Sequence, residues 1–289
     1  MPFPGPDWVA RDRYRLLSVS FNVYVTDPVM AESIRWLLGG FRLPLGEATY
    51  SVEIYPLHGD QGNEWPLYRC VIGGVVQTES WYGHDLVGAA LQGIYELVPK
   101  ATRDFLLLHA GAVVRGGAAL LLPGPPNSGK SSITLELLRT GDFAYLSDEH
   151  GAIDPVTTRA YPFQRPIRFD QDALGLFPGL EGQLADRREM PVRLMWRFVR
   201  AEDVGAEVAR PAEVRWIVLP TRDWDGPPRL TPVSSAQAVA EMARNCFNMH
   251  VYGVRGVYLL ARVAGDAKAF RLAGGTPRER AALLAERLR

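Results

Sequence analysis

The sequence is poor in cysteine and has no excess of charge of either sign. Cys70 and Cys246 are its two cysteines, too few for a disulfide framework or a zinc site. Lysine plus arginine equals aspartate plus glutamate at 32 each, so no global field draws the chain to nucleic acid or to a membrane surface. We therefore expect neither nucleic acid nor a membrane among its partners.

Long apolar runs are also missing. No stretch approaches the length of a membrane span, and residues 1–15 lack the apolar core of a signal peptide. These absences predict a cytoplasmic protein. The residues that are present, 47% hydrophobic and 22% charged, are those of a globular protein with ample material for a core.

The sequence divides into two regions that we expect to fold as an α/β protein with α+β elements. Residues 1–100 contain apolar alternation at 17–25, typical of a half-buried strand, and helical apolar spacing at 84–97. They hold no constellation of catalytic residue types and are interpreted as an accessory or substrate-docking α/β region. Residues 101–289 are the predicted catalytic domain. Within them we expect strands at 192–199, 214–219 and 257–263 and helices at 235–246 and 278–289.

Residues 124–131 read Gly-Pro-Pro-Asn-Ser-Gly-Lys-Ser and match the phosphate-loop pattern G-x-x-x-x-G-K-[ST]. An apolar run at 118–122 precedes them, and a helical segment at 131–138 follows. Glycines let successive N–H groups turn inward around phosphate oxygens, and the helix directs its positive end at the same anion. The alternative is a Gly/Pro turn that precedes Lys-Ser by chance, and the flanking elements argue against it.

This motif predicts which groups hold a nucleoside triphosphate. Lys130 would reach the β- and γ-phosphates, and the Ser131 hydroxyl would bind Mg²⁺. The motif predicts nucleotide binding but leaves the reaction open. The predicted nucleotide-binding residues are Gly124, Pro125, Pro126, Asn127, Ser128, Gly129, Lys130, Ser131 and Ser132.

Two adjacent carboxylates, Asp148 and Glu149, follow the loop closely in sequence. A helix over 131–140 rises about 15 Å, and a returning strand of five residues covers ~17 Å. A right-handed crossover makes that strand parallel to the one before the loop, so its carboxyl end arrives beside the phosphates. The pair could there hold Mg²⁺ and accept a proton from an attacking hydroxyl. The alternative is a strand that ends at a solvated turn.

His109 and Arg165 are the remaining candidates. A lone histidine in an apolar strand is ordinarily a satisfied core residue, so a catalytic or ligand role for His109 competes with that interpretation. Arg165 could clamp a γ-phosphate or an acidic substrate. A surface arginine after a proline turn is the plainer alternative.

Together these motifs resemble the catalytic domain of bacterial HPr serine kinases. The closer resemblance is to the HPr-kinase-related proteins found beside peptide-modification genes, including kinases of lasso-peptide pathways. The motifs cover roughly a fifth of the chain. They are His109-Ala-Gly-Ala, Gly116-Gly117, Gly124 to Ser131, Ser147-Asp148-Glu149 and Gln164-Arg165-Pro166-Ile167.

The resemblance implies a P-loop kinase core, shared with ATP-dependent phosphoenolpyruvate carboxykinases, with an added amino-terminal α/β segment. It implies transfer of phosphate from ATP to a Ser/Thr hydroxyl of a peptide or small protein. Asp148 would accept the proton, His109 would set the protonation of the acidic pair, and Glu149 would have a metal or supporting role. Because HPr kinases are ring assemblies, it also makes a homo-oligomer an expectation.

The chain departs from HPr kinases in three ways. Glu149 stands where those kinases carry a second aspartate. The Gly- and Arg-rich signature used for reverse phosphorolysis is missing from the sequence, and residues 1–100 do not resemble the HPr kinase regulatory domain. We therefore expect no phosphorylase activity and a substrate other than HPr.

Two other functions remain open. The first is a kinase for a small metabolite, or a carboxykinase-like enzyme, on the same core. The second is a nucleotide-binding regulatory module that phosphorylates nothing. Intact Lys130, Ser131 and Asp148 argue against the module, since it could lose them without cost.

Overall fold

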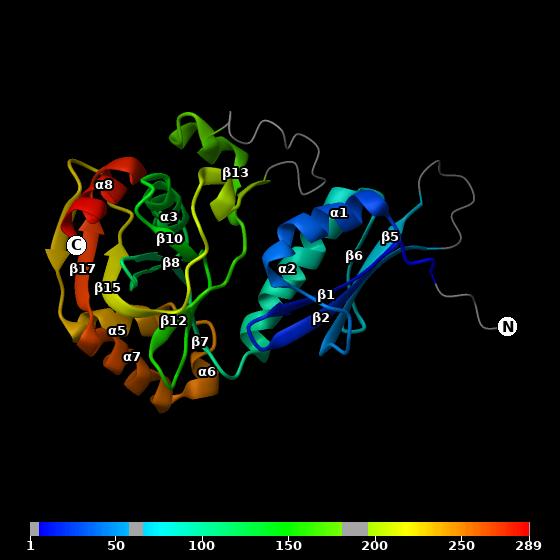
Figure 1. Cartoon of the computed structure of the whole chain (residues 1–289), viewed down its shortest axis with the longest axis horizontal. Coiled ribbons are helices and arrows are strands. Elements are labelled where there is room, and N and C mark those ends of the chain that lie inside the picture. The colour runs from blue at the N-terminus through cyan, green and yellow to red at the C-terminus, as the bar shows by residue number, and fades with distance from the viewer. Residues whose placement is uncertain (1–5, 58–65, 181–195, 289) are drawn as a thin grey trace. The chain divides into compact units, whose positions relative to one another are not determined.

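The computed structural model describes residues 6–57, 66–180 and 196–288, and they form a mixed α/β fold (Figure 1). The chain divides into two compact units: of the described residues, those up to Thr102 and Trp196 belong to the first, and the others belong to the second. Within the described ranges, no helix is both long enough and apolar enough to cross a membrane.

The first unit is a sheet with the strand order β3-β1-β2-β4-β5-β6. Two helices, α1 (Pro28–Leu37) and α2 (Gly83–Ala101), pack against it, and a 3₁₀ turn, η1 (Gly39–Phe41), follows α1. The strands are β1 (Ala10–Leu16), β2 (Val19–Val25), β3 (Arg42–Leu43), β4 (Tyr50–Pro56), β5 (Tyr68–Ile72) and β6 (Val75–Ser80).

Local sequence explains these elements. In β2 the alternating side chains of Phe21, Val23 and Val25 are buried, which confirms the half-buried strand expected at 17–25. Helix α1 begins after Asp27, whose carboxylate accepts a hydrogen bond from the Met30 N–H at 2.8 Å. The first unit therefore has its own sheet, helices and buried side chains.

The second unit is a nine-stranded sheet with the order β10-β8-β9-β15-β12-β11-β7, and β17 pairs with both β15 and β16. Strands β9, β15 and β17 are parallel neighbours. The strands are β7 (Leu106–Leu108), β8 (Ala110–Arg115), β9 (Ala118–Pro123), β10 (Ala144–Ser147), β11 (Gly151–Ile153), β12 (Arg159–Tyr161), β15 (Ala212–Pro220), β16 (Arg229–Pro232) and β17 (Lys268–Ala273), with a separate pair, β13 (Ile167–Asp170) and β14 (Trp196–Val199).

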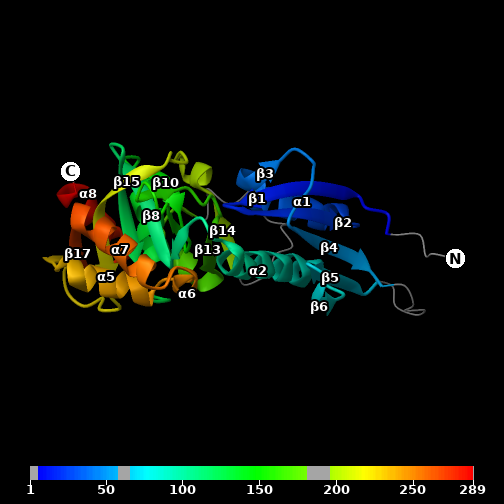
Figure 2. The same cartoon turned by 90° about the horizontal axis from the view of Figure 1, so that it is seen from below.

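Helices cover both faces of this sheet (Figures 1 and 2). In β9, Leu120 and Leu122 pack in the cluster that contains α3 (Lys130–Arg139) and α8 (Pro277–Arg287), whereas Leu121 packs in the cluster of α5 (Ser235–Arg244) and α7 (Val254–Asp266). Because both faces of β9 are buried, its sequence is a continuous apolar run. Among the described residues, the remaining short helices are α6 (Met249–Tyr252), η2 (Gln171–Leu176) and η4 (Ala201–Val204).

One predicted element is wrong. The apolar run at 257–263, expected as a strand, lies within α7. Its buried residues include Leu259, Leu260 and Val263, whereas Tyr258 is exposed, so its burial follows helical rather than strand periodicity. A short apolar run is compatible with either element until its partners are known.

The other expected elements of this region are present with shifted ends. The strand expected at 214–219 lies within β15, and the helices expected at 235–246 and 278–289 appear as α5 and α8. Of the strand expected at 192–199, β14 begins at Trp196, and residues 192–195 lie outside the described residues.

The crossover after the phosphate loop is also present with one difference. Strand β10 pairs antiparallel with β8, which pairs antiparallel with β9. Strand β10 is therefore parallel to β9, as expected, but β8 lies between them. Both strands end at the same edge of the sheet, and this edge carries the phosphate loop and the carboxylate pair.

Candidate functional site

The phosphate-loop motif occupies the turn between β9 and α3, and its backbone requires glycine. Gly129, with φ 87°, has the left-handed conformation that glycine adopts without a steric penalty. A β-carbon on Gly124 would lie 2.9 Å from the Ser128 hydroxyl oxygen, which itself donates a hydrogen bond to the Pro125 carbonyl at 2.9 Å. The loop is thus closed tightly on itself.

The start of α3 is electropositive. Its N-cap, Gly129, supplies no side-chain hydrogen bond, whereas α5 and α8 are capped by Ser234 and Thr276. Lys130 is buried in the same turn, and its Nζ donates to the Pro125 carbonyl at 2.8 Å. Burial lowers the pKa of Lys130 to about 8, although Asp148 acts in the opposite direction. The lysine therefore remains mainly protonated at neutral pH.

Asp148 faces the loop. It follows the last residue of β10, is buried, and accepts a hydrogen bond from the Ser131 hydroxyl at 2.9 and 3.0 Å to its two oxygens. Burial raises the pKa of Asp148 to about 6, as does the neighbouring Glu149, while Arg165 opposes the shift. The carboxylate is poised near neutrality, in contact with the residue expected to bind Mg²⁺.

A hydroxyl and a carboxylate are oxygen ligands that suit Mg²⁺, which keeps several waters and uses few protein ligands. Among residues 6–57, 66–180 and 196–288, no group of three or more His, Cys, Asp or Glu side chains is placed to hold a metal. Ser131 and Asp148 therefore fit a Mg²⁺ ion that is completed by phosphate oxygens and water, not an ion enclosed by protein.

Glu149 points to different partners from its neighbour. Its backbone has a φ of 73°, and its carboxylate lies 2.6 Å from Arg165 Nη1 and 3.9 Å from His109 Nε2. Burial alone would raise the pKa of Glu149, but Arg165 and other nearby cations outweigh it and hold this pKa at about 2. Glu149 is therefore ionised and matched by a fixed arginine.

Arg165 is not a surface residue, so that interpretation is wrong. It is 4% exposed. Its carbonyl accepts a hydrogen bond from the Tyr145 hydroxyl at 2.7 Å, and the Phe163 N–H donates to the Leu146 carbonyl at 2.7 Å. Both contacts attach this segment to β10, which carries the carboxylate pair at its end.

His109 lies between β7 and β8 and connects the loop to the carboxylates. Its carbonyl accepts a hydrogen bond from the Gly124 N–H at 3.2 Å, and its own N–H donates to the Asn245 carbonyl at 2.6 Å. Burial, together with Lys130, lowers the pKa of His109 to about 4, against the influence of Glu149. The imidazole is therefore neutral at neutral pH.

The aromatic side chains of Phe247 and His150 also lie at this site, and no motif in the sequence indicates them. The Phe247 ring lies 5.1 Å from the ring of His150 and 5.3 Å from that of His109, measured between centroids. Phe247 is 38% exposed beside these two histidines. Nothing in the local sequence signals this, because Phe247 reaches the site through a bridge between Leu108 and Cys246.

A second pair of residues meets the loop from the segment after β15. The Arg222 Nη2 donates to the Pro126 carbonyl at 2.7 Å, and the Trp224 ring lies against Gly129. Neither position matches a motif, and a tryptophan in a Pro/Gly-rich stretch gives no indication of what it contacts.

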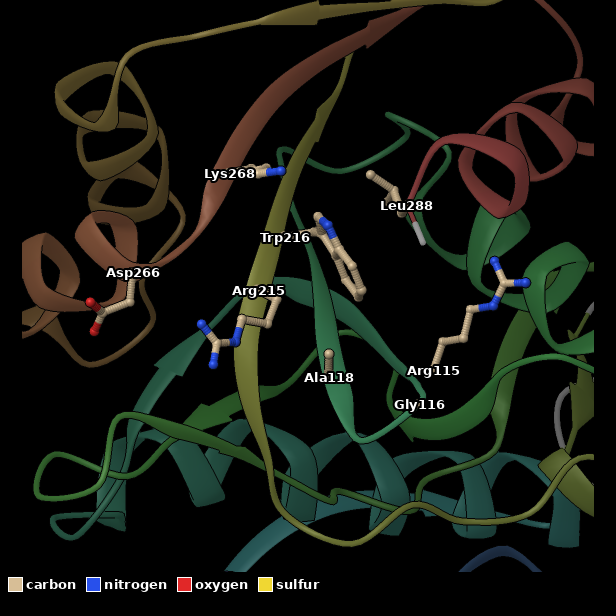
Figure 3. Close-up of a pocket in the computed structure, with 8 residues that line it drawn as sticks. All are labelled: Arg115, Gly116, Ala118, Arg215, Trp216, Asp266, Lys268 and Leu288. Carbon is tan, nitrogen blue, oxygen red and sulfur yellow. The ribbon is translucent and has the colours of Figure 1, made fainter.

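A cavity of about 480 Å³ lies elsewhere on the second unit (Figure 3). It includes the first residues of β9 and β17, so it is at the opposite end of these strands from the phosphate loop. In Figure 3 the Trp216 ring lies at its centre. The lining residues, Arg115, Gly116, Ala118, Arg215, Trp216, Asp266, Lys268 and Leu288, include none of the predicted site residues.

The structure thus brings together at one edge of the sheet the phosphate loop, Asp148, Glu149, His109 and Arg165. The contacts that join them are direct hydrogen bonds and ion pairs. Comparisons of the sequence with protein-family models and with curated proteins found no match.

Proposed function

We propose that this protein is an ATP- and Mg²⁺-dependent kinase of the cytoplasm that phosphorylates a Ser/Thr hydroxyl on a peptide or small protein. One observation carries the proposal: the hydroxyl of the loop residue Ser131 is hydrogen-bonded to a buried carboxylate, Asp148, whose pKa is raised toward neutrality. The resemblance to HPr serine kinases and to the related proteins of peptide-modification pathways supplies the acceptor class.

In the binding step, Lys130 and the amides at the start of α3 hold the triphosphate. The Lys130 ammonium now donates to a neutral carbonyl, that of Pro125. A phosphate oxygen is the better acceptor because its hydrogen bond with the ammonium is charge-assisted. Ser131 and Asp148 would hold Mg²⁺, which would supply neutralisation of the phosphate charge.

In the transfer step, the substrate hydroxyl oxygen attacks the γ-phosphorus in line. The new O–P bond forms as the bond between the γ-phosphorus and the β–γ bridging oxygen breaks, and ADP leaves with that oxygen. Asp148 takes the hydroxyl proton. In the metal-free protein its pKa of about 6 leaves it ionised at neutral pH, and a carboxylate oxygen that does not bind Mg²⁺ would accept the proton.

The charge states of Glu149 and Arg165 influence the pKa of Asp148. Arg165 fixes Glu149 at 2.6 Å, and the neutral His109 contributes no second cation to the acidic pair. The Glu149 charge thus remains beside Asp148 and keeps the Asp148 pKa raised. We assign Glu149, His109 and Arg165 to this positioning role.

The test compares Asp148→Asn with Lys130→Ala. We expect Asp148→Asn to retain ATP binding in calorimetry and to lose transfer of γ-labelled phosphate, because the amide cannot accept the proton. Lys130→Ala should lose binding as well. Retained transfer by Asp148→Asn would exclude Asp148 as the proton acceptor.

The same assay separates the alternatives when peptide and metabolite pools are supplied separately. Label in the peptide pool supports the proposal. Label confined to the metabolite pool would identify a small-metabolite kinase, and ATP binding without transfer to either pool would identify a regulatory module.

A further inference from the structure

The phosphate loop has neighbours on both sides along the sheet edge. Strands β9, β15 and β17 are parallel, so the segments that follow them, including 221–228 after β15, emerge at the same edge. In open α/β sheets, ligands bind outside the carboxyl ends of the parallel strands. Asp148 follows β10, on the other side of β9 from β15. The loop thus lies between the carboxylates and the 221–228 segment.

Trp224 of this segment lies directly against the phosphate loop. A β-carbon on Gly129 would be 2.4 Å from Trp224 Cη2, so the edge of the six-membered ring abuts the glycine that precedes Lys130. Arg222 adds the hydrogen bond to the Pro126 carbonyl. Despite these contacts, Trp224 is 40% exposed.

Arg280 covers one face of the Trp224 ring. Its guanidinium carbon lies 3.8 Å from the ring centroid, a close cation–π contact. Arg280 is fully buried, and its three nitrogens donate to the carbonyls of Gly274, Thr221 and Asp223. The arginine therefore joins the segments after β15 and β17 and holds the indole in one orientation.

One face of the Trp224 ring lies on Arg280 and one edge lies on Gly129, and these contacts leave the second face and the remaining edges of the 40% exposed residue uncovered. Trp224 is thus a rigid aromatic ring that packs on Arg280 with one face and lies next to the phosphate loop. Such a ring is suited to stacking with a flat ring of a ligand on its other face.

We propose that Trp224 is the base-binding platform of the nucleotide site, and that a purine ring stacks on its open face. The triphosphate then runs from Trp224 into the loop, with its γ-phosphate directed toward Asp148. The inference rests on the proposed function only in that a nucleotide occupies the loop; it does not require phosphate transfer. Stacking depends more on the size of the base than on its hydrogen-bonding groups. ATP and GTP, which carry purines, should therefore bind similarly, and CTP, which carries a smaller pyrimidine, should bind less well.

The experiment uses calorimetry on the full chain with ATP, CTP and inorganic tripolyphosphate, each with Mg²⁺. Trp224→Leu fills the space against Gly129 but has no π-face, and Trp224→Phe restores one. We expect Trp224→Leu to weaken ATP binding about tenfold and to leave tripolyphosphate binding within about twofold. Trp224→Phe should recover most of the ATP affinity, and Lys130→Ala should weaken both ligands.

Each contrary result has a distinct meaning. Equal loss of ATP and tripolyphosphate binding in Trp224→Leu would overturn the proposal, because the ring would then only support the loop. Unchanged ATP binding in Trp224→Leu would overturn it as well. ATP binding that depends on Trp224, with no phosphate transfer, would overturn the proposed kinase function and leave the base platform in place. Failure of the wild-type chain to bind ATP would overturn both.

Discussion

Asp148 and Glu149 are neighbours in the sequence, yet the fold gives them opposite electrostatic surroundings. Burial raises the pKa of Asp148 to about 6, whereas Arg165 leads the groups that hold the pKa of Glu149 at about 2 in spite of burial. Glu149 has a left-handed backbone, and the two carboxylates contact different partners, Ser131 and Arg165. Asp148 has a raised pKa, and Glu149 is held in an ion pair.

The raised pKa of Asp148 predicts that this residue destabilises the folded protein at neutral pH. An aspartate in the unfolded chain ionises near pH 4, about two units below the folded value. Stability therefore falls as pH rises from about 4 to about 6 and stays lowered above that. We expect ligand-free Asp148→Asn to be more stable than wild type at pH 7, on the order of 2 kcal/mol. Chemical denaturation would measure this difference.

The pH dependence supplies the control for that measurement. The difference between Asp148→Asn and wild type should shrink as the pH is lowered from 7 toward 4.5, because Asp148 in the folded wild type is then protonated and neutral, like the asparagine. A difference that is constant with pH would mean that the stabilisation has another cause.

The Arg165–Glu149 ion pair predicts a strong coupling between two residues. Arg165 is buried, so its removal leaves the Glu149 carboxylate without its closest cation. In a double-mutant cycle of Arg165→Met and Glu149→Gln, we expect a coupling energy of about 0.5–3 kcal/mol in urea unfolding. The exposed pair Arg244 and Glu241 in α5, 3.0 Å apart, is the matched control and should give roughly 0.3–0.5 kcal/mol. Equal coupling in the two cycles would contradict the structural role of Arg165.

At the level of elements, the phosphate loop depends on a partner far away in the sequence. Only glycine fits at the position of Gly129, for two independent reasons: the backbone has a positive φ, and the Trp224 ring occupies the space of a β-carbon. The ring is the end of a side chain, which would ordinarily move aside. Arg280 restrains it, so the contact is expected to be costly to disturb.

A comparison of Gly129 with Gly117 distinguishes the cost of the positive φ from the cost of the clash with the Trp224 ring. Gly117, in the β8–β9 turn, has a φ of 79° and open space around it, so Gly117→Ala carries only the backbone penalty of roughly 1–2 kcal/mol. We expect Gly129→Ala to cost more than Gly117→Ala in thermal unfolding. In a Trp224→Ala background, the two substitutions should cost about the same. An excess for Gly129→Ala that persists without Trp224 would show that the clash is not its cause.

At the scale of the whole molecule, the chain consists of two compact units, and the candidate site lies in the second. Ligand that binds only the folded second unit should stabilise that unit alone, by about 2.7 kcal/mol at a hundredfold excess over Kd. In scanning calorimetry of the full chain, we expect two transitions, of which ATP with Mg²⁺ raises one by roughly 5–10 °C. Lys130→Ala should abolish the shift. A single transition that moves as a whole would show that the units unfold cooperatively.

Much of the site follows from local pattern. The phosphate loop could be placed from its motif, because strand, glycine turn and helix are determined by residues adjacent in the chain. The approach of Asp148 to the loop could be placed from element lengths and the handedness of the crossover, and the hydrogen bond to Ser131 agrees with that geometry. The apolar run at 257–263 shows the limit of this reasoning, since its helical or extended state depended on the face it buries.

The sequence alone determined where the phosphate-loop motif and the acidic pair occur and that they meet, because these relations arise within one crossover unit. Only the tertiary structure decided how those groups are tuned. Arg165 became buried against Glu149, and Phe247 and Trp224 reached the site from distant segments. Burial and long-range packing set these contacts and the pKa of Asp148, and both arise only when the complete sheet and its helices assemble around the loop.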